Sequence, residues 1–401
     1  MTACTGCTAC AASCPKEAIT MQANTEGFLH PYINAAGCND CGLCCQICPV
    51  NNKLIKRTNT GLEKQREPLH VYAAWNLDKT IRSQSSSGGV FTALAENTLY
   101  RGGVVVGAAF DNNVIVRHII IETSAELQRL RASKYVQSKI PLDLYREIRK
   151  LLKQERPVLF SGTPCQVAGV QSFLGKSYSK LYCCDVVCHG VPSPSFFARY
   201  VQHNLERGVD LTNVSFRDKT TGWKKSCVCH HLKNGKKILI DPRDDLYMEA
   251  FARDYTLRQS CYSCGFTSTH RFGDLTLGDF WGVGKKYPEY DHDDKGTSLV
   301  LVNTKKGQTW IEACSSNLFC GAADLDTAID GNPMLARPSN CPPQRSRFFK
   351  DFDELNFTAF IKKYRLCRSM FFLRFLSVVY RRTMAIFKKV TKPRWKGRTS
   401  I

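Results

Sequence analysis

Eight of the nine cysteines in the first 50 residues form two copies of one pattern. They stand at positions 4, 7, 10 and 14 and at positions 38, 41, 44 and 48, so each member of the second set follows its counterpart by 34 residues. Each set ends in Cys-Pro, at Cys14-Pro15 and Cys48-Pro49. Three thiols at every third position form a tight loop around a [4Fe-4S] cube, and a more distant thiol supplies the fourth ligand. This part of the chain is therefore expected to fold around metal clusters rather than around an apolar core.

The duplicated run is typical of bacterial-type ferredoxins, in which the fourth cysteine of each run ligates the cluster of the other run. We therefore assign one cluster to Cys4, Cys7, Cys10 and Cys48, and the other to Cys38, Cys41, Cys44 and Cys14. Disulfides would need an oxidising compartment, and zinc sites usually show two ligand pairs set well apart. Cys45 has no place in the pattern, and we expect it to be a small buried residue beside a cluster.

The net charge of +21 is typical of nucleic-acid-binding proteins, but it is unevenly distributed. Residues 345–401 hold 16 Lys and Arg against 3 Asp and Glu, a net of +13, whereas the other 344 residues hold 40 against 32, a net of +8. Each thiolate-ligated cube carries about −2, so three cubes would nearly cancel the charge of the body. We therefore expect no nucleic-acid partner, and a nucleic-acid-binding zinc protein is the alternative that the charge and the cysteine pairs suggest.

The last part of the chain has the pattern of a basic amphipathic helix. Between about residues 370 and 392 apolar side chains fall on one helical face, Arg374, Arg381 and Lys388 repeat on the other, and Pro393 ends the pattern. No run reaches the ~18 apolar residues of a transmembrane span. Such a helix binds an anionic membrane or an acidic protein, or it packs on the domain with a solvated basic face.

The cysteine content indicates a reducing compartment. The chain has 21 cysteines, and no apolar leader precedes the first cluster ligand, Cys4. We therefore expect a cytoplasmic protein, with peripheral contact of its tail at the inner membrane face.

Between the cluster module and the tail, apolar runs and amphipathic segments alternate, which indicates an α+β class with an α/β-like mixed sheet. We expect strands at Val104–Phe110, Val114–Ile121, Pro157–Phe160, Leu181–Val187 and Leu299–Val302, and helices at Thr92–Leu99, Leu142–Gln154 and Pro194–Glu206. The expected domains are a two-cluster ferredoxin-like module at 1–55, a linker at 56–70, a central domain at 71–344 and a basic helical tail at 345–401.

Four cysteines of the central region are candidates for a third metal site. Cys165 follows an apolar run and begins a helix, whose dipole favours a thiolate. Cys188 ends another strand, and Cys261 and Cys264 form a CxxC pair. Strand ends converge in α/β sheets, so Cys165 and Cys188 would share one site with the CxxC loop, and four gathered thiolates would hold a third cluster.

Other readings of these cysteines stay open. The CxxC pair would also suit a redox disulfide or half of a zinc site, and Cys165 would suit a nucleophile with His189 as its base. Cys183 and Cys184 are substitutes for Cys188 as the fourth ligand.

A loop of small residues precedes the expected helix Thr92–Leu99. The run Ser85-Ser86-Ser87-Gly88-Gly89 brings backbone N–H groups and hydroxyls to a helix N-terminus, where they suit a pyrophosphate, although a mobile Ser/Gly loop has the same composition. In the strip Arg131–Ser138, Lys134 and Tyr135 would meet a phosphate and a ring face, and a plain surface strand is the alternative. Gln137 and Thr163 complete the candidate cofactor-binding residues. Because clusters move single electrons whereas most metabolites accept a hydride, a flavin is the cofactor expected here.

Five stretches taken together resemble the coenzyme F420 hydrogenase/dehydrogenase beta-subunit family. They are Ser85–Gly89, Gly162–Gln166, Cys188–Ser193, Cys261–Cys264 and Gly273–Gly282, and the resemblance covers about residues 70–340. It implies an FAD and a [4Fe-4S] cluster in the central domain, and electron transfer between iron–sulfur carriers and a hydride acceptor. In the archaeal members that acceptor is a deazaflavin coenzyme, whereas some related bacterial chains are associated with surface-polysaccharide genes and others reduce chlorophyll-type substrates.

The sequence therefore predicts an oxidoreductase that depends on FAD and iron–sulfur clusters. Electrons from a ferredoxin or another redox protein would enter at the N-terminal clusters, pass through the third cluster to FAD at the Ser85–Gly89 loop, and leave as hydride to a small molecule, or flow in reverse. Asp274 and Asp279 would shape the flavin or acceptor pocket, or cap turns. The alternative is a non-catalytic electron-transfer partner of another enzyme, including one linked to surface-polysaccharide metabolism.

Overall fold

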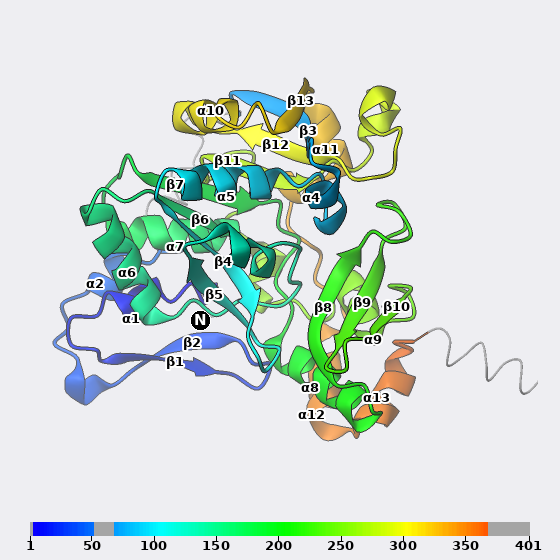
Figure 1. Cartoon of the computed structure of the whole chain (residues 1–401). Coiled ribbons are helices and arrows are strands. Elements are labelled where there is room, and N and C mark those ends of the chain that lie inside the picture. Colours follow the sequence, from blue (N-terminus) through cyan, green and yellow to red (C-terminus); the bar gives the residue numbers. More distant parts are fainter. Residues whose placement is uncertain (1–2, 52–67, 368–401) are drawn as a thin grey trace, which may run out of the picture.

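The computed structural model describes residues 3–51 and 68–367 (Figure 1). Most of the expected linker at 56–70 and the amphipathic helix expected near 370–392 lie outside the described residues. Within the described ranges, no helix is long and apolar enough to cross a membrane.

A mixed sheet forms the centre of the described structure. Its strands are β3 His70–Asn76, β4 Val104–Phe110, β5 Val116–Ile121, β6 Val158–Gly162, β7 Leu181–Val186, β11 Leu275–Asp279, β12 Ser298–Val302 and β13 Leu318–Ala322. They lie in the order β13-β3-β12-β11-β7-β6-β4-β5 (Figure 1). The neighbours β4, β6, β7 and β11 run parallel, and the remaining pairs are antiparallel. The expected mixed sheet is confirmed.

Helices cover both faces of this sheet. They are α4 Lys79–Gln84, α5 Val90–Tyr100, α6 Leu142–Lys153, α7 Pro164–Leu174, α10 Lys305–Glu312 and α11 Leu325–Gly331. Apolar side chains of α5 and α10 share one core with one face of the sheet, and those of α6 and α7 share a second core with the opposite face. Alternate residues of a strand point to opposite faces, so neighbouring Cys183 and Cys184 of β7 enter different cores.

A second, smaller sheet carries an aromatic core beside the first (Figure 1). Its elements are β8 Leu211–Asp218, β9 Cys227–Leu232, β10 Lys237–Ile240, α8 Pro194–Glu206, α9 Leu246–Ala252, α12 Arg345–Glu354 and α13 Phe357–Tyr364. Phe196, Phe348 and Phe360 are fully buried in this core. The boundary that the sequence placed at 345 is therefore wrong, because α12 and α13 complete the core of the central domain.

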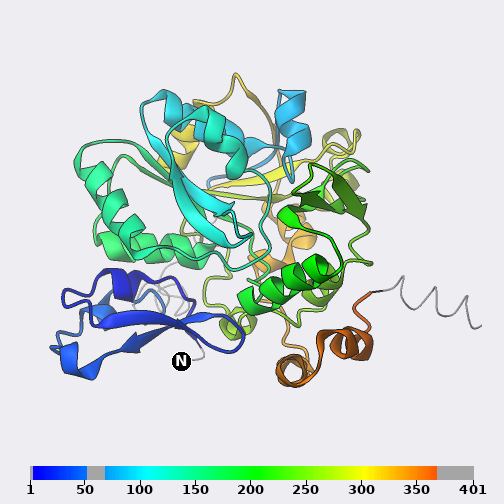
Figure 2. The same ribbon diagram turned by 60° about the horizontal axis from the view of Figure 1, so that its bottom comes forward.

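The N-terminal module packs directly on the central domain. It consists of α1 Ala9–Ala12, β1 Ile19–Ala23, β2 Leu29–Ile33, the 3-10 turn η1 Ala35–Gly37 and α2 Leu43–Gln46. Its residues Cys7, Ala9 and Ala12 belong to the same apolar core as α6 and α7, and Figure 2 shows the module against these helices. The Thr8 hydroxyl donates to the carbonyl of Ile140 at 3.1 Å. Module and domain thus share a continuous interior.

Short 3-10 turns connect the larger elements. They are η2 Ser124–Arg129, η3 Gln259–Ser263, η4 Val283–Lys285, η5 Pro288–Tyr290 and η6 Pro333–Leu335. The strip Arg131–Ser138 that follows η2 is irregular, so its alternative reading as a surface strand is wrong. The other expected strands and helices are present, with ends that shift by one to two residues.

We predict that Phe348→Ala lowers the free energy of unfolding by about 3–5 kcal/mol, because it leaves a cavity in the aromatic core. Phe348 is 0% exposed, and its ring contacts those of Phe196, Phe360 and Tyr364. Tyr100→Ala is the control, since Tyr100 is 92% exposed. Urea denaturation followed by tryptophan fluorescence checks the difference, and equal stabilities of the two variants would contradict a core role for α12.

Candidate functional site

The second set of cysteines comes together at one edge of the sheet. Strands β6 and β7 are parallel neighbours, so their carboxyl ends open at the same place. Cys165 lies in the first turn of α7, directly after β6, and Cys188 follows β7. Cys261 lies in η3 and Cys264 immediately after it. All four thiols line a single cavity.

Local hydrogen bonds fix the turn that carries Cys165. Thr163 and Gln166 form a reciprocal capping box at the start of α7, and Pro164 occupies the first helical position. The Thr163 hydroxyl lies 3.1 Å from the Cys165 sulfur. The sequence therefore presents this thiol at a rigid helix start.

The cavity disfavours thiolates in the absence of metal. Burial raises the pKa of Cys165 to about 11 and that of Cys261 to about 12, and it raises the pKa of Cys188 well above its usual range. Negative charge on neighbouring thiols of the set raises these values further. The backbone at the start of α7 lowers the pKa of Cys165, as expected at a helix N-terminus, but burial outweighs this effect. A metal that displaces the protons would be bound strongly by such thiols.

The cavity would offer a cube four cysteines and two hydroxyl donors that have no partner among the described residues. Among the residues that the structure describes, no group of three or more His, Cys, Asp or Glu side chains converges closely enough to hold one metal ion. A cube spreads its ligands over four irons, so its thiolates stand further apart than those around one tetrahedral zinc. The buried hydroxyls of Thr5 and Ser260 line the same cavity and have no hydrogen-bond partner in the described ranges. Cluster sulfides would accept from them.

Of the alternatives for these cysteines, the geometry disfavours the use of Cys183 or Cys184 in place of Cys188. Cys183 and Cys184 are buried in apolar cores and do not line the cavity. His189, the base considered for Cys165, has its Nε2 2.5 Å from Asp254 Oδ1. All the described cysteines are free thiols, including the CxxC pair.

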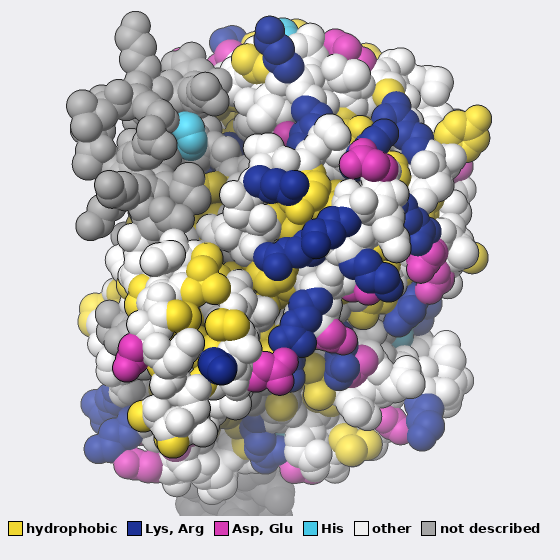
Figure 3. Space-filling view, turned by 90° about the vertical axis from the view of Figure 1, so that its left-hand side faces the viewer, with side chains coloured by type: hydrophobic (Ala, Val, Ile, Leu, Met, Phe, Trp, Pro, Cys, Tyr) yellow, Lys and Arg dark blue, Asp and Glu magenta, His cyan; other side chains and the backbone are white. Residues whose placement is uncertain are grey.

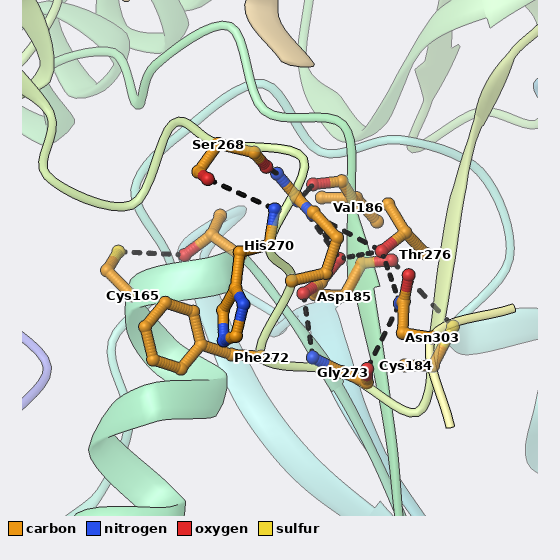
Figure 4. Close-up of polar contacts among 12 residues, drawn as sticks. Cys165, Cys184, Asp185, Val186, Ser268, His270, Phe272, Gly273, Thr276 and Asn303 are labelled. Atoms are coloured by element: carbon orange, nitrogen blue, oxygen red, sulfur yellow. Dashed lines mark hydrogen bonds and ion pairs between the residues drawn. The ribbon is translucent and has the colours of Figure 1, made fainter. Parts of the chain in front are cut away.

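A buried polar network joins β7 to the segment that precedes β11, beside the cavity (Figure 4). Asp185 of β7 accepts from the Arg271 guanidinium at 3.0 Å, from the Thr276 hydroxyl at 2.7 Å and from the Gly273 N–H at 2.9 Å. Arg271 also donates to the carbonyl of Val186 and lines the cavity. The network ties the end of β7 to the segment before β11, which keeps Cys188 in place.

In the N-terminal module, the thiols of the two runs interact across the repeat. Burial raises the pKa of Cys7 to about 12 and that of Cys10 to about 11, and both thiols lie close enough to Cys48 for their charges to interact. Cys14 lines a cavity with Leu43 and Ile47 of the second run. The two runs thus lie side by side, and the exchange of fourth ligands stays a prediction. Cys45 is exposed, so its expected burial is wrong.

A larger cavity of about 650 Å³ lies next to the third cysteine set. Of the candidate cofactor-binding residues, it is lined by Ser85, Ser86, Ser87, Gly89, Lys134, Tyr135 and Thr163. Gly88 and Gln137 do not line it. A Cβ at Gly88 would lie 2.3 Å from the carbonyl oxygen of Ala74, so this glycine allows close backbone packing. The Gln137 side chain instead donates to the carbonyl of Thr5 at 2.9 Å.

The Ser/Gly loop is held in place by the protein itself. Ser86 Oγ accepts from the Ser133 N–H at 2.9 Å, Ser87 donates to the carbonyl of Thr297 at 3.0 Å, and Lys219 Nζ donates to the carbonyl of Ser87 at 2.6 Å. Gly89, with φ of +86°, precedes α5 and no side chain caps this helix. The serine hydroxyls are therefore used within the protein, whereas the backbone N–H groups at the start of α5 are available to a ligand.

The Lys134 ammonium, expected to meet a phosphate, binds backbone carbonyls instead. Its ammonium donates to the carbonyls of Arg129 at 3.0 Å and Arg131 at 2.5 Å. Burial lowers its pKa to about 7. The Tyr135 ring stacks on Phe251, so Lys134 and Tyr135 shape the cavity wall.

The two aspartates of the Gly-rich strip have different surroundings. Asp279 lines the large cavity and accepts from the Trp223 indole at 2.7 Å. Asp274 accepts from the Cys183 N–H and the Thr304 hydroxyl, away from the cavity.

Sequence reasoning missed the histidine in the wall of the large cavity. His118 of β5 is buried, and its Nδ1 lies 2.7 Å from Ser138 Oγ while its Nε2 lies 3.0 Å from the carbonyl of Ser161. A carbonyl only accepts, so Nε2 carries the proton and Nδ1 accepts from Ser138. Burial lowers the pKa of His118 to about 4. In the sequence, His118 is a single polar residue within an apolar strand, and nothing there indicates that it lines a cavity.

The two cavities share a wall. Cys188, His189, Gly190, Val191 and Met334 line both of them. A group bound among the four cysteines and a group bound in the large cavity would therefore be separated mainly by the segment Cys188–Val191.

Comparisons with known proteins divide the chain in the same way. Residues 71–142 match the amino-terminal domain, and residues 155–327 the carboxy-terminal domain, of the beta subunit of coenzyme F420 hydrogenase/dehydrogenase. Residues 3–52 match the 4Fe-4S dicluster domain.

Individual relatives cover the same regions. The F(420)H(2) dehydrogenase of Methanosarcina mazei has a chain, its F subunit, that is 24% identical over 318 residues, which are 73% of this chain and 83% of the relative. The ferredoxin-type protein NapF of Haemophilus influenzae is 42% identical over 45 residues, which are 11% of this chain and 26% of that protein. A chain of the F420-reducing [NiFe] hydrogenase complex from Methanosarcina barkeri aligns with a TM-score of 0.44 and 15% identity, over 67% of this chain and 91% of that chain.

We predict that His118 weakens the protein in acid. Because its pKa in the folded state, about 4, lies below the usual 6.5, the unfolded chain binds the proton more readily, and stability is lost as pH falls below 6.5. The loss is about 1.4 kcal/mol per pH unit. The measurement is the difference between the urea midpoints at pH 7 and pH 5. It should be smaller in His118→Gln than in the parent protein. The control is His292→Gln, at an exposed position, which should leave the difference unchanged.

Proposed function

Because the chain belongs to the coenzyme F420 hydrogenase/dehydrogenase beta-subunit family and carries a 4Fe-4S dicluster domain, we propose that it is an iron–sulfur flavoprotein oxidoreductase. In this proposal a third cluster is held by Cys165, Cys188, Cys261 and Cys264, and the large cavity binds FAD. The observation that carries the proposal is the shared wall between the four-thiol cavity and the large cavity. When bound, the clusters would move single electrons and the flavin would exchange them for a hydride.

The position of the cysteines supports an order for the four sites. Cys41 is exposed, and the other ligands assigned to its cluster are partly exposed, so this cluster would be the outer one. Cys7 is buried, and its thiol lies near both Cys10 and Cys165. The cluster of Cys7 would thus stand between the outer cluster and the four-thiol cavity. We refer to these two N-terminal sites as the outer and the inner cluster.

The residues around the large cavity are suited to hold a dinucleotide. The first turn of α5, from Val90 to Thr92, lines the cavity without a side-chain cap, and its N–H groups would receive the pyrophosphate. Tyr135 and Trp281 offer apolar ring surface in the wall. Asp279 would face the cofactor or the acceptor. We propose a hydride-accepting coenzyme as the substrate, with the deazaflavin F420 as the first candidate, because the relative from Methanosarcina mazei is named for it.

A basic surface beside the outer cluster supports docking of an acidic electron carrier such as a ferredoxin. Arg146 and Arg149 of α6 line the cavity that contains Cys14, and Lys150 and Lys153 continue this helix as exposed residues. Figure 3 shows the side of the molecule that carries α6, where Lys and Arg side chains gather beside apolar surface. Complementary charge would speed encounter and orient the carrier toward the outer cluster.

The experiment that tests the proposal is the content of iron, sulfide and flavin in protein purified without oxygen. About twelve irons and one FAD per chain are expected. About eight irons without flavin would contradict the proposal and leave a two-cluster relay.

We predict that Cys188→Ser loses about four irons per chain, since one cube loses a ligand. Cys183→Ser should keep the full iron content, because Cys183 lies in the apolar core of α6 and α7. Iron analysis and the visible spectrum check the pair, and loss of iron from Cys183→Ser alone would reverse the ligand assignment.

We predict that replacing both Lys150 and Lys153 by Glu raises KM for a reduced ferredoxin roughly tenfold, because the two changes reverse local charge. Reduction by the small dye methyl viologen should be unchanged. The control replaces Lys236 and Lys237, which are exposed at the β9–β10 turn, by Glu. An equal effect of both double variants would point to net charge and not to docking at α6.

A further inference from the structure

Arg258 is a buried cation that lacks a buried anion. It is 2% exposed, and it donates to the carbonyl of Cys4 at 2.7 Å, to the carbonyl of Leu29 at 2.9 Å and to Gln137 Oε1 at 3.0 Å. All of these acceptors are neutral. No carboxylate in the described part of the chain pairs with this guanidinium. The guanidinium also lies over the Phe28 ring, 5.3 Å from its centroid, and beside the ring of His30, whose pKa is lowered by burial and by the charge of Arg258.

A second arginine of the same cavity has the carboxylate partner that Arg258 lacks. Arg271 also lines the four-thiol cavity, but it is paired with Asp185 at 3.0 Å, and the two side chains are 1% and 0% exposed. A buried charge is tolerated when an opposite charge compensates it, and an uncompensated one costs several kcal/mol. Arg258 is therefore expected to have its counter-charge in a group that joins the protein after synthesis.

The neighbours of Arg258 identify that group by its chemistry. The guanidinium lies close enough to Cys4, Cys165 and Cys261 for their charges to interact. Cys4 belongs to the inner cluster, and the other two belong to the proposed third cluster. Each thiolate-ligated cube carries about −2 by charge counting. Arg258 thus lies between two sites that become anionic when clusters are inserted.

The main chain is shaped to bring the inner cluster loop onto this arginine. Gly6, two residues after Cys4, has φ of +70°, and a Cβ there would lie 2.8 Å from the Arg258 guanidinium nitrogen and 2.9 Å from Gln137 Nε2. A side chain at this position would separate the loop from Arg258.

We infer that Arg258 is a positioning residue that couples the inner cluster to the third cluster and raises the reduction potential of both. Each reduction adds one electron to a cube, which makes its charge more negative by one unit. A fixed cation in a medium of low dielectric stabilises that reduced form. Because the same cation faces both cubes, it favours electrons at the two sites through which they must pass, relative to the outer cluster. This inference rests on the third cluster of the proposed function.

The experiment is a redox titration of the anaerobic holoprotein followed by electron paramagnetic resonance, with iron content measured in parallel. Arg258→Gln removes the cation, and Gln137→Glu leaves it but supplies a carboxylate next to it, as Asp185 does for Arg271. Both variants should shift the reduction equilibrium of the inner and third clusters roughly tenfold toward the oxidised form, which is about 59 mV for a one-electron couple. Arg258→Lys keeps the charge and should shift it much less. The outer cluster is the internal control and should not move.

Other results would contradict either the role of Arg258 or the proposed function. Unchanged potentials in Gln137→Glu and Arg258→Gln at full iron content would reduce Arg258 to a structural role. If Arg258→Gln loses iron, Gln137→Glu at full iron content decides the question, because it keeps the arginine and removes only the amide bond to the Thr5 carbonyl. Equal shifts at all three clusters would indicate a global change. A parent protein with only two clusters would instead contradict the proposed function, independently of Arg258.

Discussion

The packing of the first cysteine loop on α7 is the contact on which the other sites depend. Cys7 lies against Gly169, where a Cβ would come within 2.9 Å of the Cys7 Cβ, so only glycine permits this approach. The loop and helix α1 thereby enter the apolar core of α6 and α7. Since α7 also carries Cys165 at its start, a single helix connects the N-terminal module to the four-thiol cavity.

The parallel pair β6 and β7 creates the rest of the arrangement. Residues that follow both strands are delivered to one edge of the sheet, and there the chain between Cys188 and Val191 separates two cavities. The sheet is continuous and its central strands are buried, so the fold sets the separation of groups that bind at this edge.

In the proposed holoprotein, clusters would compensate the charge and polarity of this interior. Buried thiols whose pKa is raised by burial, hydroxyls without partners and an arginine without a carboxylate would each destabilise a metal-free protein. In the proposed function, insertion of clusters would convert all three into favourable interactions. Folding and cluster loading are therefore expected to be strongly linked, as in other small metal modules.

The sequence by itself determined the features that depend on local spacing. The duplicated cysteine runs, the mixed sheet, the capped helix start at Cys165 and most strand and helix limits could all be read from short segments, because ligand loops and periodicity are local. It did not determine which of Cys183, Cys184 and Cys188 enters the four-thiol cavity, that Gln137 faces the N-terminal module, that residues 345–366 complete a core, or that Cys45 is exposed. Only the tertiary structure decided these points, because each depends on contacts between distant segments. The clearest case is Arg258, whose bond to Cys4 joins residues 254 positions apart and which no motif marks in the sequence.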